Sequence, residues 1–292
     1  SVFYAPLYVA IEKGYFKDEN IDLTLVTGFG ADKTMTAVIS GEADIGFMGS
    51  EASVYMYSEG ASDYVVNFAQ LTQRAGNFLV ARQDNEHFQW ADLKGKTVLG
   101  GRKGGMPEMV FEYILKENGI DPEKDLTIIQ NIDFGSTAPA FADGRGDFTI
   151  EFEPGATSLE SEGKGHVIAS LGKDSGYVPY TAFSAKKSYL KENPDVIQRF
   201  TNALQKGMDY VRSHSPSETA SVIKPQFPET TLEMITTIVT RYYEQDTWKS
   251  NLIFEESSFD LLQDILESAG ELEKRAPYKD LITTEFAENA AK

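Results

Sequence analysis

Apolar positions recur with two different periods along the first two thirds of the chain. Apolar residues at every second position, or in short continuous runs, predict strands, whereas a spacing of three and four predicts helices. The two kinds of segment follow one another in turn, which is typical of parallel sheets flanked by helices. The predicted strands are residues 21–28, 43–49, 63–70, 96–101, 125–130, 147–153 and 166–172, and the predicted helices are 5–16, 33–41, 50–60, 106–119, 136–144 and 155–163.

Beyond about residue 188 the pattern becomes almost entirely helical. Long amphipathic segments are separated by prolines and a few polar residues, which end one helix before the next begins. The predicted helices here are residues 194–214, 231–246 and 258–270.

Two stretches of the α/β part resemble each other. Residues 41–60 (GEADIGFMGSEASVYMYSEG) and 144–163 (GRGDFTIEFEPGATSLESEG) align without gaps and share glycine, aspartate, serine and glutamate positions. Turn residues recur by chance in any α/β chain, so the likeness has two interpretations: chance, or two lobes of like topology. The second is favoured, because "KDENID" and "KENGID" also recur upstream.

Two facing lobes would direct their strand tips at a common cleft. In open α/β sheets, ligands bind beyond the carboxyl ends of the strands, near helix N-termini. The alignment places residues 48–51 (MGSE) opposite residues 151–154 (EFEP). Glu151 and Glu153 therefore lie at a strand tip that is predicted to face a ligand. The alternation of apolar residues in the strand does not by itself explain why acids occur there.

Composition narrows the class of protein. The 292 residues carry 27 Lys and Arg against 45 Asp and Glu, a net charge of −18, which argues against a nucleic-acid surface. Cysteine is absent, which excludes disulfides and thiolate sites, and no apolar run has the length of a membrane span. The opening "SVFYAPLYVA" looks like the end of a strand entering a helix, so an export signal or anchor is expected to have been trimmed ahead of it.

Four segments in order carry a family resemblance: "YAPLYVAIEKGYFKDENIDLTLV", "AVISGEADIGF", "ADLKGKTVLGG" and "GRGDFTIEFEPG". They resemble the substrate-binding proteins of ABC importers for nitrate, sulfonates, riboflavin and thiamine-type pyrimidines. The resemblance covers about residues 3–185. It implies an α/β, type II periplasmic-binding-protein fold with two lobes around a ligand cleft and a two-strand hinge.

The resemblance also implies a domain division. The first lobe would comprise residues 1–80 and 184–292, with the C-terminal helices packed mainly on it, and the second lobe residues 81–183. The hinge strands would be residues 77–82 and 180–186. Such a protein works extracytoplasmically, as a periplasmic protein or a lipoprotein. It would be a monomer without a cofactor, and its partners would be a small-molecule ligand, an ABC permease and its ATPase.

Three kinds of feature line the predicted cleft. Glycine- and serine-containing loops precede four helices, where backbone N–H groups can approach a ligand, although such glycines also serve simply as tight turns. Aromatic residues near the strand tips suit stacking on a flat ligand, or core packing. Acids complete the set. The predicted ligand-binding residues are Tyr4, Pro6, Gly30, Lys33, Met48, Gly49, Ser50, Glu51, Gly104, Gly105, Met106, Phe134, Ser136, Glu151, Phe152 and Glu153.

The acids decide which ligand is favoured. Carboxylates repel a sulfonate or nitrate, but they accept hydrogen bonds from the amino group of an aminopyrimidine. In the thiamine-pyrimidine binders of the family, a carboxylate at this strand end contacts the pyrimidine, and the resemblance carries that role to Glu153, with Glu151 next. The alternative is a salt bridge to the other lobe. A thiamine-type ligand is therefore favoured over an oxyanion or riboflavin.

Other classes of function have less support. The thiamine-pyrimidine synthases share this fold, but their family uses a cysteine-rich motif that is missing here. The three histidines are scattered, and no G-x-S-x-G or metal-binding spacing occurs. A sensor module would need an attached DNA-binding or signalling domain. A non-enzymatic binding protein is therefore predicted.

Overall fold

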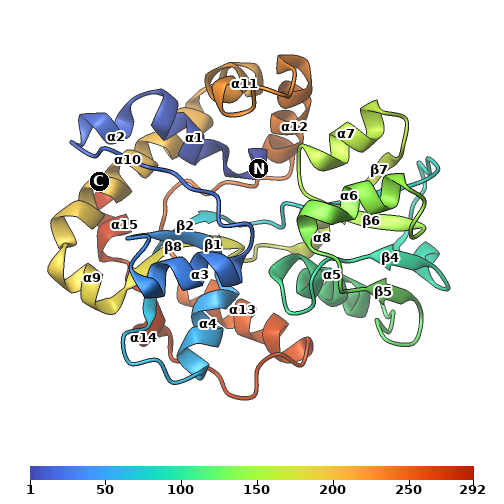
Figure 1. Ribbon diagram of the computed structural model, residues 1–292, viewed down its shortest axis with the longest axis horizontal. Coiled ribbons are helices and arrows are strands. Elements are labelled where there is room, and N and C mark those ends of the chain that lie inside the picture. Colours follow the sequence, from blue (N-terminus) through green and yellow to red (C-terminus); the bar gives the residue numbers. More distant parts are fainter.

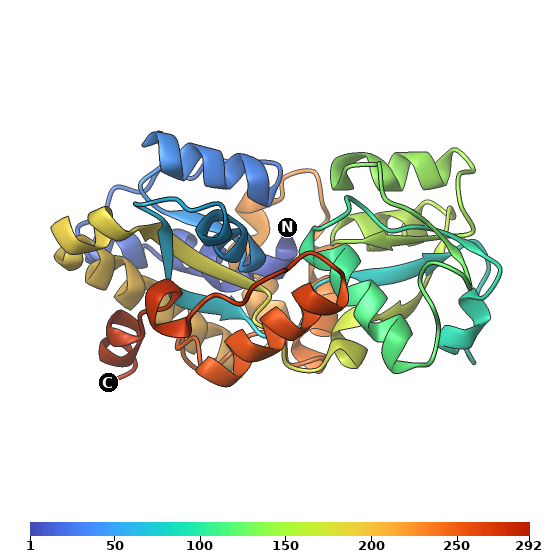
Figure 2. The ribbon, with the colours of Figure 1, turned by 90° about the horizontal axis from the view of Figure 1, so that it is seen from below.

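Two α/β lobes lie side by side in the computed structural model, which describes residues 1–292 (Figures 1 and 2). The first lobe holds a three-stranded sheet of order β1-β8-β2, and the second a five-stranded sheet of order β5-β4-β6-β3-β7. The strands are β1 (Gly46–Gly49), β2 (Val65–Thr72), β3 (Phe78–Ala81), β4 (Thr97–Leu99), β5 (Thr127–Ile129), β6 (Phe148–Glu151), β7 (His166–Ser170) and β8 (Thr181–Lys186).

Helices flank both sheets and form the C-terminal part of the chain. Those of the α/β part are α1 (Ala5–Glu12), α2 (Tyr15–Asp18), α3 (Ala31–Ser40), α4 (Glu51–Ser58), α5 (Met106–Glu117), α6 (Phe134–Ala142), α7 (Gly155–Ser161) and α8 (Leu171–Ser175). The C-terminal ones are α9 (Lys187–Glu192), α10 (Pro194–Ser213), α11 (Pro216–Ile223), α12 (Leu232–Glu244), α13 (Glu256–Ser268), α14 (Tyr278–Leu281) and α15 (Glu285–Ala290). Short 3₁₀ turns are η1 (Val2–Tyr4), η2 (Trp90–Leu93) and η3 (Lys224–Gln226).

The predicted internal repeat is present in the fold. In the first lobe α3, β1 and α4 follow one another, and in the second lobe α6, β6 and α7 do the same. Gly41 ends the first helix of one unit at φ +84°, and Gly144 follows that of the other at φ +105°. Glycine adopts these positive φ angles without the steric cost that other residues meet, so both copies need it there.

The predicted parallel sheets are only partly correct. β4 pairs in parallel with β5 and β6, but β3 pairs antiparallel with β6 and β7, and β8 pairs antiparallel with β1 and β2. β3 and β8 are the strands that enter a sheet from the opposite lobe. They therefore start at the junction, where the other strands end.

The crossing points differ from the predicted hinge strands. Residues 77–82 and 180–186 do contain strands, but β3 pairs only within the second sheet and β8 only within the first. The chain crosses between the sheets in the residues just before each strand, 73–77 and 176–180. The predicted lobe boundary at residue 80 consequently falls inside β3.

Residues 21–28 do not form the predicted strand. They have no strand partner, and the side chains of Leu25 and Val26 are 50% and 78% exposed. Alternation predicts an extended backbone, whereas a strand also requires a neighbour for its N–H and C=O groups. The local pattern could not report that requirement.

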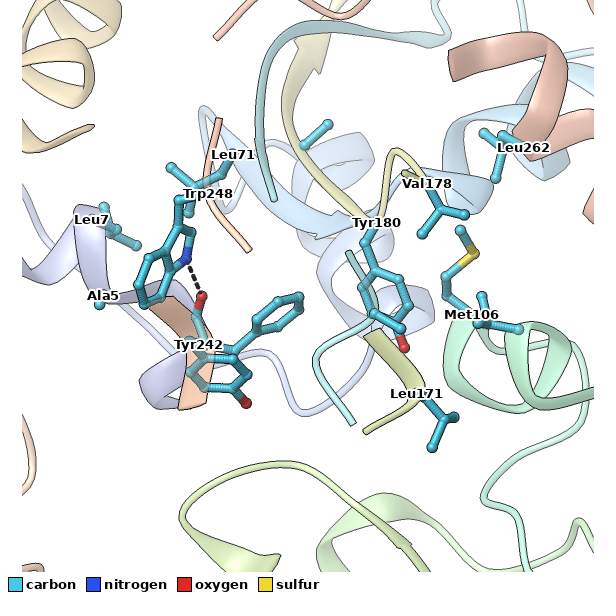
Figure 3. Packing of buried hydrophobic residues seen from close by; sticks show 14 of the residues in the cluster. Ala5, Leu7, Leu71, Met106, Leu171, Val178, Tyr180, Tyr242, Trp248 and Leu262 are labelled. Carbon is cyan, nitrogen blue, oxygen red and sulfur yellow. Dashed lines mark hydrogen bonds between the residues drawn. The ribbon is translucent and has the colours of Figure 1, made fainter. Parts of the chain in front are cut away.

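The C-terminal helices join the two lobes as well as covering the first. α10 packs on α1, α2 and α15, as predicted, but α13 packs on α5 of the second lobe and lies beneath the junction (Figure 2). A single cluster of 62 buried apolar residues runs through both lobes. Figure 3 shows part of it, with Leu71 of β2 and Met106 of α5 in one field around Tyr180 and Tyr242.

Candidate functional site

The start of the chain meets the tip of β6 at the junction of the lobes. The Ser1 Oγ donates to the Glu153 carbonyl at 2.7 Å, and the Val2 N–H donates to the same oxygen at 3.3 Å. The Phe3 ring centroid lies 6.1 Å from that of Phe152, which lies 5.5 Å from that of Phe134 in an edge-on arrangement. The predicted strand tip therefore faces the first lobe.

Further contacts close the junction. The Tyr55 hydroxyl on α4 donates to the Gly104 carbonyl at 2.9 Å, and the Lys116 ammonium on α5 donates to the Ser268 hydroxyl at 3.1 Å. Two surface hollows of about 440 and 230 Å³ contain none of the predicted ligand-binding residues. At the junction, groups of both lobes contact each other.

Glu51 is the acid of the first lobe at this junction. It begins α4 and is 3% exposed, and its Oε2 has no hydrogen-bond partner. The carboxylate lies over Gly49, where an added Cβ would come within 2.1 Å of Oε2, so a larger residue there would have to displace the carboxylate. Burial raises the pKa of Glu51 to about 7, and the charge of Arg102 and the N–H of Met106 partly oppose that rise.

Glu151 ends β6 and is also 3% exposed. Its Oε1 accepts a hydrogen bond from the Thr149 hydroxyl at 2.7 Å. Burial raises the pKa of Glu151 to about 7, and hydrogen bonds from Thr149 and Thr137 partly oppose the rise. This carboxyl is therefore held by threonines of its own lobe.

Glu153 is engaged on both carboxylate oxygens. Its Oε1 accepts from the Thr157 N–H at 2.6 Å, and its Oε2 accepts from the Thr157 hydroxyl and lies 3.6 Å from the Arg241 Nη1 on α12. Burial raises the pKa of Glu153, while Thr157 and Arg241 act in the opposite direction. The structure thus shows a salt bridge at Glu153, which was the alternative to a ligand contact for this acid.

The remaining predicted residues fall into two groups. Tyr4 is half-buried, lies 4.7 Å from Phe47 between ring centroids, and has its pKa raised by burial, with the Glu51 charge adding to the rise. The residues at the junction, besides those described, are Gly105 and Met106.

The other group is exposed at the starts of helices or packs in the core. Gly30, Lys33 and Ser136 are exposed at the starts of α3 and α6. The Pro6 carbonyl packs against Gly207 of α10, and Met48 belongs to a small core cluster under α3.

Ser50, predicted to bind the ligand, donates its hydroxyl to the Pro179 carbonyl. That contact ties the tip of β1 to the second crossing segment. No capping bond to the helix backbone is formed.

Sequence reasoning did not single out three residues that shape the site. Tyr55, Arg102 and Arg241 all carry charge or hydrogen bonds to the acids or loops at the junction. Arg102 lies within a loop already predicted to face the ligand, so its charge could have been noted. Arg241 lies 88 residues beyond Glu153 on a helix, and no local signal connects the two.

The structure contains no cluster of three or more acidic or histidine side chains arranged to bind a metal ion. Among the helices, a membrane-spanning candidate is not found.

Ligand-free stability is expected to fall as the pH rises from 5 to 8. Glu51 and Glu151, with pKa values of about 7, and Glu108, whose pKa is raised by burial and by the neighbouring Glu112, keep protons that the unfolded chain releases near pH 4.5. Each such carboxyl lowers the free energy of unfolding at high pH by roughly 1–3 kcal/mol. This loss develops progressively between about pH 4.5 and the pKa of the group in the folded protein. Thermal unfolding at several pH values measures this.

The net charge of −18 also disfavours the compact state at high pH, so a variant is needed to isolate the buried acids. Glu108→Gln removes one of the buried acids and should make the stability of the ligand-free protein depend less on pH. An unchanged slope in that variant, or a melting temperature that rises with pH, would contradict the assignment.

The sequence profile of the family described as "NMT1/THI5 like" matches residues 2–218. "Putative binding protein YtlA" of Bacillus subtilis (strain 168) is 50% identical over 288 residues, which cover 99% of this chain and 86% of that protein. The 4-amino-5-hydroxymethyl-2-methylpyrimidine phosphate synthase of Candida albicans (strain WO-1) is 23% identical over 232 residues, covering 73% of this chain and 64% of the enzyme.

Among solved structures, the alkanesulfonate-binding protein SsuA of Xanthomonas axonopodis pv. citri, bound to MOPS, superimposes with a TM-score of 0.78. The identity is 16%, and the match covers 97% of this chain and 96% of that one. At this identity the likeness shows the fold, and the predicted α/β periplasmic-binding-protein fold is confirmed.

Proposed function

The chain belongs to the NMT1/THI5-like family, and from that premise we propose that it is the solute-binding protein of an ABC importer. It binds a small amino-heteroaromatic ligand of the thiamine or thiamine-pyrimidine type by closure of its lobes. It works extracytoplasmically as a monomer and delivers the ligand to a permease driven by an ATPase. Ligand contacts made with both lobes favour the closed form that the permease recognises.

One observation carries the choice of ligand. The four charged residues that are buried in the protein are all glutamates, Glu51, Glu108, Glu151 and Glu153, and no lysine or arginine is buried. A buried carboxylate stabilises a hydrogen-bond donor or a cation and repels an anion. The rings of Phe134 and Phe152 beside Glu151 and Glu153 offer a flat ligand apolar surface.

The family relatives are consistent with a pyrimidine. A Candida relative is named as a synthase of a 4-amino-5-hydroxymethyl-2-methylpyrimidine phosphate, a compound with an amino group on a flat ring. The 50% identical relative is named as a binding protein, which supports binding in preference to synthesis. Riboflavin, also a flat heteroaromatic, is a further alternative.

A sulfonate- or nitrate-type ligand is the second candidate, and Arg102 favours it. This half-buried arginine forms no ion pair and stands just before the N-terminus of α5, which attracts anions. SsuA, which has the same fold, is named as an alkanesulfonate-binding protein. Glu51 opposes this candidate, because its charge already acts on Arg102.

A thermal-shift panel distinguishes the candidates. Thiamine, hydroxymethyl- and formylamino-pyrimidines, riboflavin, taurine and nitrate are tested at equal concentrations. A ligand at 100 times its Kd stabilises by about 2.7 kcal/mol, which in a protein of this size raises Tm by roughly 5 °C. We expect that shift with a pyrimidine compound; a shift confined to taurine or nitrate would contradict the proposed ligand class.

A further inference from the structure

One acceptor atom at the junction of the lobes has no partner. Glu51 is 3% exposed, and its Oε2 is buried without a hydrogen bond. A buried acceptor that loses water without gaining a donor destabilises the protein that contains it. The arrangement of the lobes in this structure therefore leaves a donor group missing at this atom.

We propose that Glu51 is the anchor of the first lobe for the ligand and that it accepts a hydrogen bond from an amino or protonated ring N–H group. This inference rests on the proposed function, because it assigns a residue and a ligand group to the same site. Glu51 then sets the selectivity for donor-bearing ligands over anions, and Glu153 holds the architecture of the second lobe.

The partners of the three acids support this division of roles. Both oxygens of Glu153 are occupied by Thr157, with Arg241 alongside, and Glu151 is held by Thr149. A ligand would have to displace these internal bonds to reach Glu153 or Oε1 of Glu151. Of the three acids, Glu51 is the one with a fully buried oxygen that has no hydrogen-bond partner.

The position of Glu51 suits an anchor used during closure. It is the first residue of α4, directly beyond the tip of β1, and the charge of Arg102 and the N–H of Met106 act on it from the second lobe. Separation of the lobes would remove those neighbours and expose the carboxylate to solvent. Closure on a ligand would then bury the ligand's N–H group against Oε2.

Two neighbours fit the same assignment. Gly49 leaves the space that the carboxylate occupies, since a Cβ there would lie 2.1 Å from Oε2. Tyr4 lies near enough for the Glu51 charge to raise its pKa, and no hydrogen bond within the protein involves the Tyr4 hydroxyl. A flat ligand bound to Glu51 would have this ring and hydroxyl beside it.

The test compares Glu51→Gln with Glu108→Gln. Both variants replace a buried glutamate by its neutral isostere, but Glu108 already accepts a hydrogen bond from Gln130 at 2.6 Å. Calorimetric titration with hydroxymethylpyrimidine, thiamine and taurine gives the Kd of each variant, and far-UV circular dichroism and thermal unfolding without ligand report folding.

We expect Glu51→Gln to raise the Kd for the amino-heteroaromatic ligand by about 10- to 100-fold, as for a lost hydrogen bond to a charged group. Glu108→Gln should change it less than threefold. Taurine should bind Glu51→Gln no more weakly than it binds the wild type.

Each other result has a defined meaning. If the wild type binds none of the amino-heteroaromatic compounds, the proposed ligand class fails, and this inference fails with it. If the wild type binds one and Glu51→Gln binds it equally well, only this inference is overturned. Loss of the ligand-free fold in Glu51→Gln would assign Glu51 a structural role and would also overturn it.

Discussion

Replacement of Phe3 by alanine is expected to lower the free energy of unfolding by about 3–5 kcal/mol, the usual cost of truncating a buried phenylalanine. Phe3 is completely buried, and its ring lies within 6.1 Å, between centroids, of the rings of Tyr4, Phe152, Tyr180 and Tyr242. These rings come from η1, the tip of β6, the second crossing segment and α12. Removal of the Phe3 ring therefore opens a cavity where both lobes and the C-terminal helices meet.

The geometry leaves the neighbours of Phe3 little freedom to collapse into that cavity. The Phe3 carbonyl accepts a hydrogen bond from the Trp248 indole at 2.8 Å, drawn as a dashed line in Figure 3. The Tyr242 hydroxyl donates to the Gly76 carbonyl at 2.8 Å, which fixes a second ring of the group. The cost of a cavity is greatest where its lining cannot move, so a value in the upper part of the range is expected.

Denaturant unfolding of the ligand-free protein measures the effect, and Phe29→Ala is the matched control. The Phe29 side chain is 82% exposed, so its removal should change the unfolding free energy by less than about 0.5 kcal/mol. Equal losses in the two variants, or a loss below about 1 kcal/mol for Phe3→Ala, would show that the aromatic group does not hold the junction.

The sequence predicted the elements well where their causes are local. The period of apolar residues located α5 and α10, and the glycines at residues 41 and 144 marked the repeat that the fold contains. Residues 21–28 show where local information ends. Their alternation is that of a strand, but strand formation depends on a neighbour that the sequence does not identify.

The position of the acids at the junction was predictable, but the partner of each acid was not. Alignment of the two repeats placed residues 48–51 opposite residues 151–154. Of these, Glu51 and Glu153 lie at the junction, whereas Met48 packs in a core cluster. The family resemblance favoured Glu153 as the first ligand contact. Whether an acid is available to a ligand depends on whether it is already paired within the protein. Glu153 is paired with Arg241, which lies far away in the sequence on α12. The preference for a ligand role of Glu51 follows only from its unpartnered oxygen.

The pairing of Arg241 with Glu153 has a consequence for how the lobes are held. Arg241 lies on α12, beside the start of the chain, and its guanidinium also donates to Thr157 at 2.9 Å and to Glu160 at 3.0 Å, both on α7 of the second lobe. One arginine thus joins a C-terminal helix to the helix that follows the β6 tip. Loss of this contact would affect the fold first, and ligand binding only through it.

Arg241→Ala is expected to destabilise the ligand-free protein by about 2–3 kcal/mol at pH 8, because it leaves the buried Glu153 without its countercharge. The value lies below that for a fully buried pair, since the Arg241 side chain is 25% exposed while that of Glu153 is 0% exposed. Loss of Arg241 raises the pKa of Glu153 further, so the penalty should fall as the pH is lowered towards the pKa of an exposed glutamate. Denaturant unfolding at pH 5 and pH 8 measures both effects.

A double-mutant cycle with Glu153→Gln separates the pair from its surroundings. Once Glu153 is neutral, removal of Arg241 leaves no buried charge behind, so the double variant should be nearly as stable as Glu153→Gln alone, with a coupling of about 2–3 kcal/mol. Arg275→Ala is the matched control, because Arg275 pairs with Glu267 and Asp264 at the surface, where such pairs contribute about 0–1 kcal/mol. Additive losses in the cycle would contradict the pairing. A large loss of ligand affinity in Glu153→Gln with its stability unchanged would contradict a purely structural role for Glu153 and would favour its contact with the ligand.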